Sequence, residues 1–180
     1  MEELRICCFL GETERAQELL QTHQLNINQS NEGGSTALII ACEFGRIEIV
    51  ELLLEEKGID LNAENKFGET AFFMACAFGE TEIVKILLKR DDVNLNKEDK
   101  LGRTPIDAAI YNGFYKTAQW VLTSPKLINL RKHRNAIQSK NDSGNIELKE
   151  TLDLLTSYQV SPNRTRNQIR RKFKIIDSGL

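Results

Sequence analysis

The side chains best suited to chemistry in this sequence are its four cysteines, Cys7, Cys8, Cys42 and Cys76. A zinc site usually takes Cys or His ligands from two pairs, each spaced by two to four residues, and these cysteines do not supply such pairs. The last three recur every 34 residues, as equivalent positions of a stacked repeat would. Such positions lie about 10 Å apart, whereas a disulfide needs Cα atoms within about 7 Å. We therefore interpret all four as small buried residues.

Other patterns of catalysis or cofactor binding are missing from the sequence. The two histidines, His23 and His133, fall in a loop and in an irregular segment, and neither accompanies a nucleophile and an acid. Neither common glycine-rich phosphate-binding motif occurs. Acidic pairs such as Glu55-Glu56 fall at the ends of expected helices, where carboxylates are simply solvated. We therefore expect no catalytic activity, no metal and no cofactor.

The composition is that of a soluble globular protein. The chain has 180 residues, of which 41% are apolar and 28% charged, and its formal net charge is −2. So small a net charge gives the whole molecule no preference for an anionic or a cationic partner. The acidic N-terminus does not resemble a signal peptide, and no stretch approaches the ~20 apolar residues of a membrane span. We expect a cytoplasmic protein, with the nucleus as the alternative location, and no transmembrane segment.

The sequence repeats itself with a period of 34 residues. Glycines, leucines, threonines and small residues each recur at this step. The recurring positions are Gly11, Gly45, Gly79 and Gly113; Leu20, Leu54, Leu88 and Leu122; Gly34, Gly68 and Gly102; Thr36, Thr70 and Thr104; and Cys7, Ala41, Ala75 and Ala109. Because so many columns agree, the fold is best predicted from the repeat first.

Each unit has the pattern of two short helices followed by a loop. A threonine precedes a segment of small and apolar residues such as "TALIIACEFG", where its side-chain oxygen can cap the first helix and the final glycine can end it. The next segment, such as "IEIVELLL", has apolar pairs at helical spacing. The connecting "GIDLNAENKFGE" is typical of an extended loop with a tight turn. The predicted fold class is all-α, a helix-turn-helix solenoid with short β-turn loops.

These features resemble the ankyrin-repeat family. "TPIDAAIYNG" (residues 104–113) is close to the family's T-P-L-H-x-A signature, and "GRIEIVELLL" and "GETEIVKILL" are similar to its second helix. The period also suits tetratricopeptide repeats, but the Asn-, Asp- and Gly-rich loop favours ankyrin. The family's histidine is replaced by Ile39, Phe73 and Asp107, which predicts weaker hydrogen bonding between repeats.

The resemblance covers about residues 1–130 and divides the chain into units. We expect repeats at about 1–30, 31–64, 65–98 and 99–131, followed by a degenerate closing unit at 132–157. Residues 158–180 would form a flexible basic tail. A polar terminal unit is what a solenoid needs at its exposed end.

The resemblance also implies a protein-binding module, in which partners contact the loop tips and the exposed side of the first helices. We expect an adaptor, inhibitor or assembly factor that is monomeric and binds a protein partner on this concave face. The corresponding positions are Glu32, Gly33, Ser35, Glu43, Phe44, Lys66, Phe67, Glu69, Ala77, Phe78, Lys100, Leu101, Arg103, Tyr111 and Asn112, with Phe9 and Leu10 in the first unit.

Five of these side chains would form one apolar strip edged by charge, which is how interface cores are built. They are Phe44, Phe67, Phe78, Leu101 and Tyr111. For Phe44 and Phe78, packing onto the next layer remains an alternative to partner binding. Phe67 and Leu101, at the loop tips, are the stronger candidates for partner contact.

One loop asparagine recurs in each unit, at Asn28, Asn62 and Asn96. Each follows the repeated leucine by eight residues, and this placement is similar to that of asparagines that an oxygen-dependent hydroxylase modifies in ankyrin proteins. We favour a structural role in the loop.

The C-terminal segment carries the alternative function. From Tyr158 to Leu180 there is one acidic residue, Asp177, against six basic residues: Arg164, Arg166, Arg170, Arg171, Lys172 and Lys174. Such a run can bind phosphates, anionic lipid or an acidic protein face, or act as a nuclear-import signal. Base-specific nucleic-acid recognition is not expected, because Phe173 alone could stack on bases.

Overall fold

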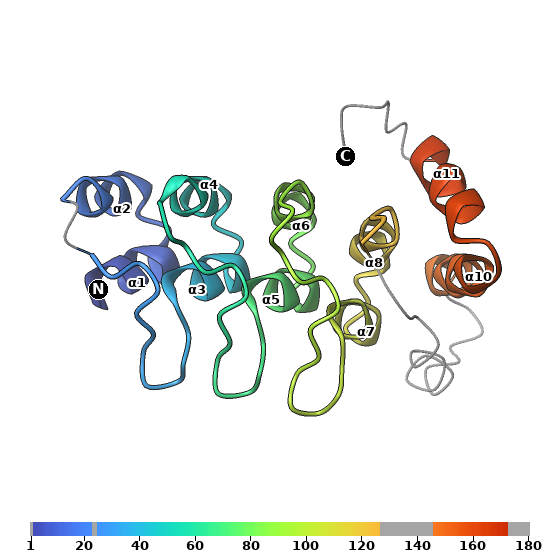
Figure 1. The fold of residues 1–180 in the computed structure, drawn as a ribbon, viewed down its shortest axis with the longest axis horizontal. Helices are drawn as coiled ribbons and strands as arrows, with labels where there is room; N and C mark the ends of the chain where they lie inside the picture. The colour runs from blue at the N-terminus through green and yellow to red at the C-terminus, as the bar shows by residue number, and fades with distance from the viewer. Residues whose placement is uncertain (1, 23–24, 127–145, 173–180) are drawn as a thin grey trace.

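The computed structural model describes residues 2–22, 25–126 and 146–172, apart from the side chains of residues 158–160. Within these ranges the chain is helical and has no strand, as the sequence predicts. The first helix of each unit lies in an inner row: α1 (Glu2–Leu10), α3 (Ala37–Glu43), α5 (Ala71–Ala77) and α7 (Pro105–Tyr111). The second helix of each unit lies in an outer row: α2 (Thr13–Leu20), α4 (Ile47–Glu55), α6 (Thr81–Leu88) and α8 (Tyr115–Val121). Hairpin loops project from the opposite side of the inner row (Figure 1).

The recurring threonines begin the inner helices as predicted. The Oγ1 of Thr36 and that of Thr70 each accept a hydrogen bond from the backbone N–H three residues on, at 3.3 and 3.2 Å. Thr104 does the same for Asp107, whose carboxylate accepts in return from the Thr104 N–H at 2.9 Å. Asp107 replaces the family's histidine, so this side chain serves the start of its own helix through a reciprocal cap.

The core runs along the interior between the two rows. Every residue of α5 is buried, and the small residues that recur at Ala41, Ala75 and Ala109 are fully inaccessible. Because these positions have no bulk, adjacent inner helices pack closely, and the apolar sides of the outer helices close the core. The stability of such an array is therefore a sum over the interfaces between neighbouring units.

A side chain from the next unit covers each of the first three turn glycines. Gly11, Gly45 and Gly79 all have positive φ, and the residue that covers each of them lies 35 positions further on: Arg46, Glu80 and Phe114 respectively. A Cβ built on Gly79 would lie only 2.3 Å from the Phe114 ring. Glycine is thus required here both for its backbone angle and for the approach of the next repeat.

The loop asparagines join consecutive units. The Asn28 amide donates to the carbonyl of Gly58 and accepts from the N–H of Asp60, both at 2.8 Å. Asn62 repeats the arrangement with Asp92 and Asn94, both at 2.7 Å. Each of these two amides thus uses both of its polar atoms to satisfy backbone groups of the following loop, which supports the structural role.

The C-terminal segment differs from the flexible tail expected from sequence. Helix α10 (Ile146–Val160) packs on α8, and α11 (Pro162–Lys172) packs on α10 and buries Thr165 and Ile169. Pro162 interrupts the helix as expected, but it also occupies a first-turn position, where its missing N–H is tolerated, and so it starts α11. Residues 132–145 of the predicted closing unit and Lys174 of the predicted basic tail lie outside the described residues. His23 and His133 also lie outside them.

Candidate protein-binding surface

The hairpin tips are shaped by an asparagine or aspartate at their base. The Asn65 Oδ1 accepts hydrogen bonds from the N–H groups of Phe67 and Glu69, at 2.9 and 3.0 Å. Asp99 holds the next hairpin in the same way, through the N–H groups of Leu101 and Arg103 at 2.9 and 2.8 Å. These hydrogen bonds close each turn through backbone N–H groups. The side chains of Phe67 and Leu101 are left pointing outward.

Neighbouring hairpins are also bonded to each other. The N–H of Lys66 donates to the carbonyl of Gly33, and that of Lys100 to the carbonyl of Phe67, both at 2.8 Å. These backbone bonds fix the spacing of the tips, so the side chains there are presented from a connected row rather than from independent loops.

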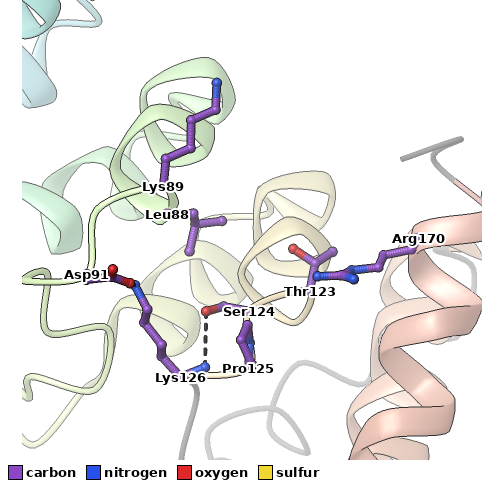
Figure 2. Close-up of a pocket in the computed structure, with 8 residues that line it drawn as sticks. All are labelled: Leu88, Lys89, Asp91, Thr123, Ser124, Pro125, Lys126 and Arg170. Atoms are coloured by element: carbon purple, nitrogen blue, oxygen red, sulfur yellow. Dashed lines mark hydrogen bonds and ion pairs between the residues drawn. The ribbon is translucent and has the colours of Figure 1, made fainter. Parts of the chain in front are cut away.

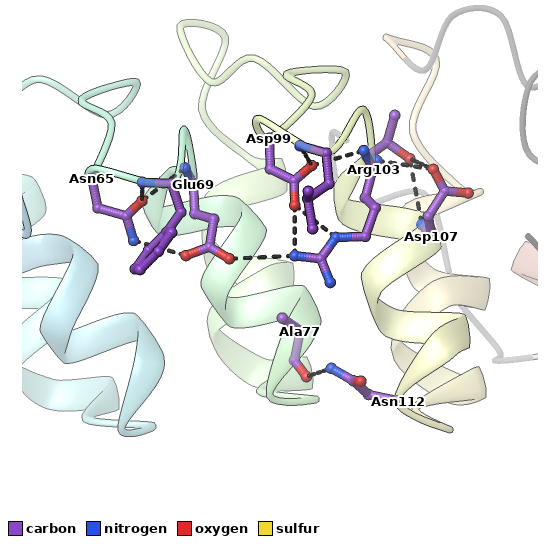
Figure 3. A network of polar contacts seen from close by, with 10 residues as sticks. Asn65, Glu69, Ala77, Asp99, Arg103, Asp107 and Asn112 are labelled. Carbon is purple, nitrogen blue, oxygen red and sulfur yellow. Dashed lines mark hydrogen bonds and ion pairs between the residues drawn. The ribbon is translucent and has the colours of Figure 1, made fainter.

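A chain of polar contacts links two hairpins across the start of α5 and α7 (Figure 3). The Asn65 amide donates to Glu69 at 2.8 Å, the other Glu69 oxygen lies 3.6 Å from the Arg103 guanidinium, and Arg103 pairs with Asp99 at 2.6 Å. The Arg103 guanidinium also lies over the Phe73 ring, 5.7 Å from its centroid. Glu69 and Arg103, predicted as partner contacts, are therefore committed in large part to holding the tips.

The tips of the second and third hairpins form a basic and apolar patch. We call Phe67 and Leu101 the tip patch; they are 67% and 78% exposed, and each follows an exposed lysine, Lys66 or Lys100. The first hairpin has no large apolar residue at its tip, where Glu32 and Gly33 stand instead.

A second apolar group lies where the inner helices end. We call it the helix-end strip, and its exposed members are Phe9, Leu10, Phe44, Phe78 and Tyr111. The rings of Phe9 and Phe44 meet edge to face, with their centroids 4.7 Å apart. At the fourth unit the polar Asn112 takes the equivalent place, and its amide donates to the Ala77 carbonyl at 2.7 Å. The strip is thus continuous across the first two units and extends to Tyr111.

The single apolar strip expected from the sequence is in fact two groups. The hairpins enter the inner helices at their first turn, while Phe44, Phe78 and Tyr111 stand at or beside the last. A seven-residue helix is about 10 Å long. Figure 3 shows the same separation: the Asn65–Arg103 contacts lie at one end of the helices and the Ala77–Asn112 bond at the other. The sequence did not predict this division.

Carboxylates near the helix-end strip are partly withdrawn from water. Burial raises the pKa of Glu43, and the nearby charge of Glu69 raises it further. Burial also raises the pKa of Glu80, although the positive charge of Arg46 works in the opposite direction. The helix-end strip is therefore bordered by acidic groups, whereas the tip patch is bordered by lysines.

The basic residues of α11 are divided between the protein and solvent. Arg164 and Arg171 are exposed, whereas Arg166 donates to the Pro125 carbonyl at 3.4 Å and Lys172 pairs with Glu150 of α10. Arg170 points toward the end of α8 (Figure 2). It lines a cavity of about 190 Å³ with Leu88, Lys89, Asp91, Thr123, Ser124, Pro125 and Lys126.

This cavity lies at the C-terminal ends of α6 and α8. Lys126 pairs with Asp91 at 2.8 Å and donates to the Arg90 carbonyl at 2.7 Å (Figure 2 shows the side chains). Helix C-termini carry partial negative charge. We interpret the cations here as partners of helix ends and of Asp91 rather than as an anion-binding site.

The cysteines are buried, free thiols in the inner row. Burial, together with the neighbouring Cys7, raises the pKa of Cys8 to about 12, and burial likewise raises the pKa of Cys42 and Cys76. Thiols in this state are poor nucleophiles and poor metal ligands at neutral pH. Across the described ranges no three His, Cys, Asp or Glu residues are grouped to hold a metal ion. No helix among the described residues has the length and apolar character to cross a membrane.

Two family models match the chain. One, described as ankyrin repeats in three copies, matches residues 58–132, and the other, described as ankyrin repeats in many copies, matches residues 19–75. A search of curated proteins found no match. Ankyrin repeats generally mediate protein–protein interaction and are generally non-catalytic. Because the two matches together span residues 19–132, well over half of the sequence, and the paired helices in that range show the repeat, the chain belongs to the ankyrin-repeat family.

Proposed function

We propose that this protein is a non-catalytic recognition module that binds a partner protein on the concave face, through the tip patch and the helix-end strip. One observation carries the proposal. Ten large apolar side chains are exposed in the described ranges, and nine of them lie on inner helices, in the turns that follow them or at hairpin tips. The tenth is Ile146, the first residue of α10.

An isolated exposed apolar residue is ordinary on a protein surface, but a gathering of them on one side marks an interaction site. The aromatic members are the residue types that dominate binding energy at protein interfaces. They stand on helices and hairpins that are bonded to their neighbours, so little conformational entropy is lost when a partner binds.

The test is affinity capture from a native lysate, with captured proteins identified by mass spectrometry. Wild-type protein is compared with Phe67→Ala/Leu101→Ala and with Phe44→Ala/Phe78→Ala. We expect one stoichiometric protein whose Kd rises at least about tenfold in one or both variants, the effect of losing a well-buried interface anchor. Thermal unfolding of each variant confirms that the fold is kept.

A matched control addresses the alternative function. Arg164→Glu/Arg171→Glu reverses two exposed charges of α11 without removing the helix, whereas truncation at residue 157 would uncover the surface of α10 that Ile169 occupies. The proposal expects this variant to capture the same protein as wild type. Capture that depends on the α11 charges and disappears with rising salt would contradict it, since that is the behaviour of an anionic-surface binder.

A further inference from the structure

The turn that ends α3 is built differently from the equivalent turns on either side. In the first unit, the Arg46 guanidinium lies over Gly11 and donates to the Phe9 carbonyl at 2.8 Å. In the third unit, Asn112 donates to the equivalent carbonyl, that of Ala77, at 2.7 Å. A carbonyl in the last turn of each of these helices therefore accepts a hydrogen bond from a side chain of the next repeat.

The second unit has neither of these two donors. The residue over Gly45 is Glu80, whose carboxylate oxygen lies 2.6 Å from where a Cβ would stand. The position equivalent to Asn112 is Phe78, which cannot donate. In the part of the chain that the structure describes, no side chain donates to the Glu43 carbonyl, and the carboxylate sits at a helix C-terminus, where a cation is favoured.

The surroundings of this turn suit a cation with an apolar stem. Phe44 and Phe78, which belong to the two turns that Glu80 joins, are 39% and 48% exposed. A lysine or arginine can lay its methylene stem on such rings while its charged end reaches the carboxylate and the carbonyl.

The charged groups near this turn compensate its negative character only in part. Arg46 lowers the pKa of Glu80 but is hydrogen-bonded to the Phe9 carbonyl, and Glu69 raises the pKa of Glu43. Arg103, at the other end of the inner helices, is paired with Asp99 and Glu69.

We propose that the turn between α3 and α4 is the seat for one lysine or arginine side chain of the partner, held by the Glu80 carboxylate and the Glu43 carbonyl against Phe44 and Phe78. The inference rests on the proposed function and makes it more specific: the partner segment at the helix-end strip carries a basic residue among apolar ones. The same position is Arg46 or Phe114 in the neighbouring units, so this seat occurs once in the described array.

The test uses two short peptides, acetyl-Leu-Lys-Leu-amide and its norleucine counterpart, titrated into the ¹⁵N-labelled full chain. Amide shifts of residues 43–46 and 78–80 should saturate with the lysine peptide at a Kd about tenfold lower than with norleucine, a difference of about 1.4 kcal/mol. Glu80→Gln should abolish the difference, and Glu51→Gln, an exposed site on α4, should keep it. Lowering the pH from neutral should weaken lysine binding as Glu80 takes up a proton, since burial has already raised its pKa.

A second variant tests whether peptide binding depends on the missing hydrogen-bond donor and not merely on one negative charge. Glu80→Arg should supply the missing donor from within the chain, block the lysine peptide and leave the fold intact. Equal affinity for both peptides, shifts located elsewhere, or no saturable shifts would overturn the seat. The capture experiment with Phe44→Ala/Phe78→Ala is unaffected by any of these outcomes, so failure of the seat and failure of the recognition face are distinguishable.

Discussion

At the scale of single residues, the joints between repeats depend on what lies over the turn glycines. Arg46, Glu80 and Phe114 occupy one repeated position, yet one is a cation, one an anion and one an aromatic ring. The backbone joint tolerates all three because glycine leaves room and takes the positive φ. The residue over the glycine can therefore differ from unit to unit, while the glycine is kept.

Two glycine substitutions separate the energetic cost of the positive φ from the cost of a collision with the next repeat. Gly113→Ala should cost about 1–2 kcal/mol, because φ is +86° there but no described atom lies within 4 Å of the new Cβ. Gly79→Ala has a similar φ of +76° and also collides with the Phe114 ring, which should add roughly 1–3 kcal/mol. Equilibrium urea unfolding of both variants measures the difference. Equal losses would show that Phe114 moves aside without cost.

The sequence predicted those structural features that depend on a single residue type at a repeated position. The threonine caps, the turn glycines, the small residues of the inner row and the buried cysteines all follow from composition at a repeated position. It missed contacts made between units, such as the Asn62 bridge or Arg46 on the Phe9 carbonyl. Those depend on how one unit is rotated against the next, which the pattern within a unit does not specify.

At the scale of secondary-structure elements, α11 shows how composition misleads. Its eleven residues include five basic and no acidic ones, the composition of a solvated tail. The signal that it packs is slight: Thr165 and Ile169 are four residues apart and so share one helix face. Both are buried, with Ile169 fully inaccessible against α10. A single buried isoleucine thus distinguishes a docked helix from a flexible tail.

Ile169→Ala should loosen α11 from α10. Removing this buried side chain should lower the free energy of opening by about 2–4 kcal/mol, a range typical of large-to-small core changes. Amide hydrogen exchange over residues 165–172 measures it directly. Gln168→Ala, at an exposed neighbouring position, is the control and should leave protection unchanged. A wild-type chain whose amides exchange there at unprotected rates would contradict the docked helix.

At the scale of the whole molecule, stability is distributed along the array. The cysteines can serve as probes of local opening in successive units. Cys7 and Cys8 lie in the first unit, Cys42 in the second and Cys76 in the third, all buried. End units of a solenoid have one neighbour instead of two and open more readily. Because the thiol pKa values are raised by burial, reaction with an alkylating reagent requires such opening.

We therefore expect the cysteines to be alkylated in order along the chain. Cys7 and Cys8 should react first and Cys76 last, all slowly in native protein and rapidly in denaturant. Peptide mass spectrometry of samples quenched over time gives the rate at each site. A uniform rate at all four sites would instead mean that the array opens as one cooperative unit.

The exposed apolar side chains at the two ends of the inner helices also have different charged neighbours. Lysines flank Phe67 and Leu101 at the tips, and carboxylates border Phe44 and Phe78 at the far end. A partner segment long enough to cross from one end to the other would need acidic and apolar residues at its first contact and basic and apolar residues at its second. Reversing that segment would place like charges together, so we expect a partner segment to bind in one direction only.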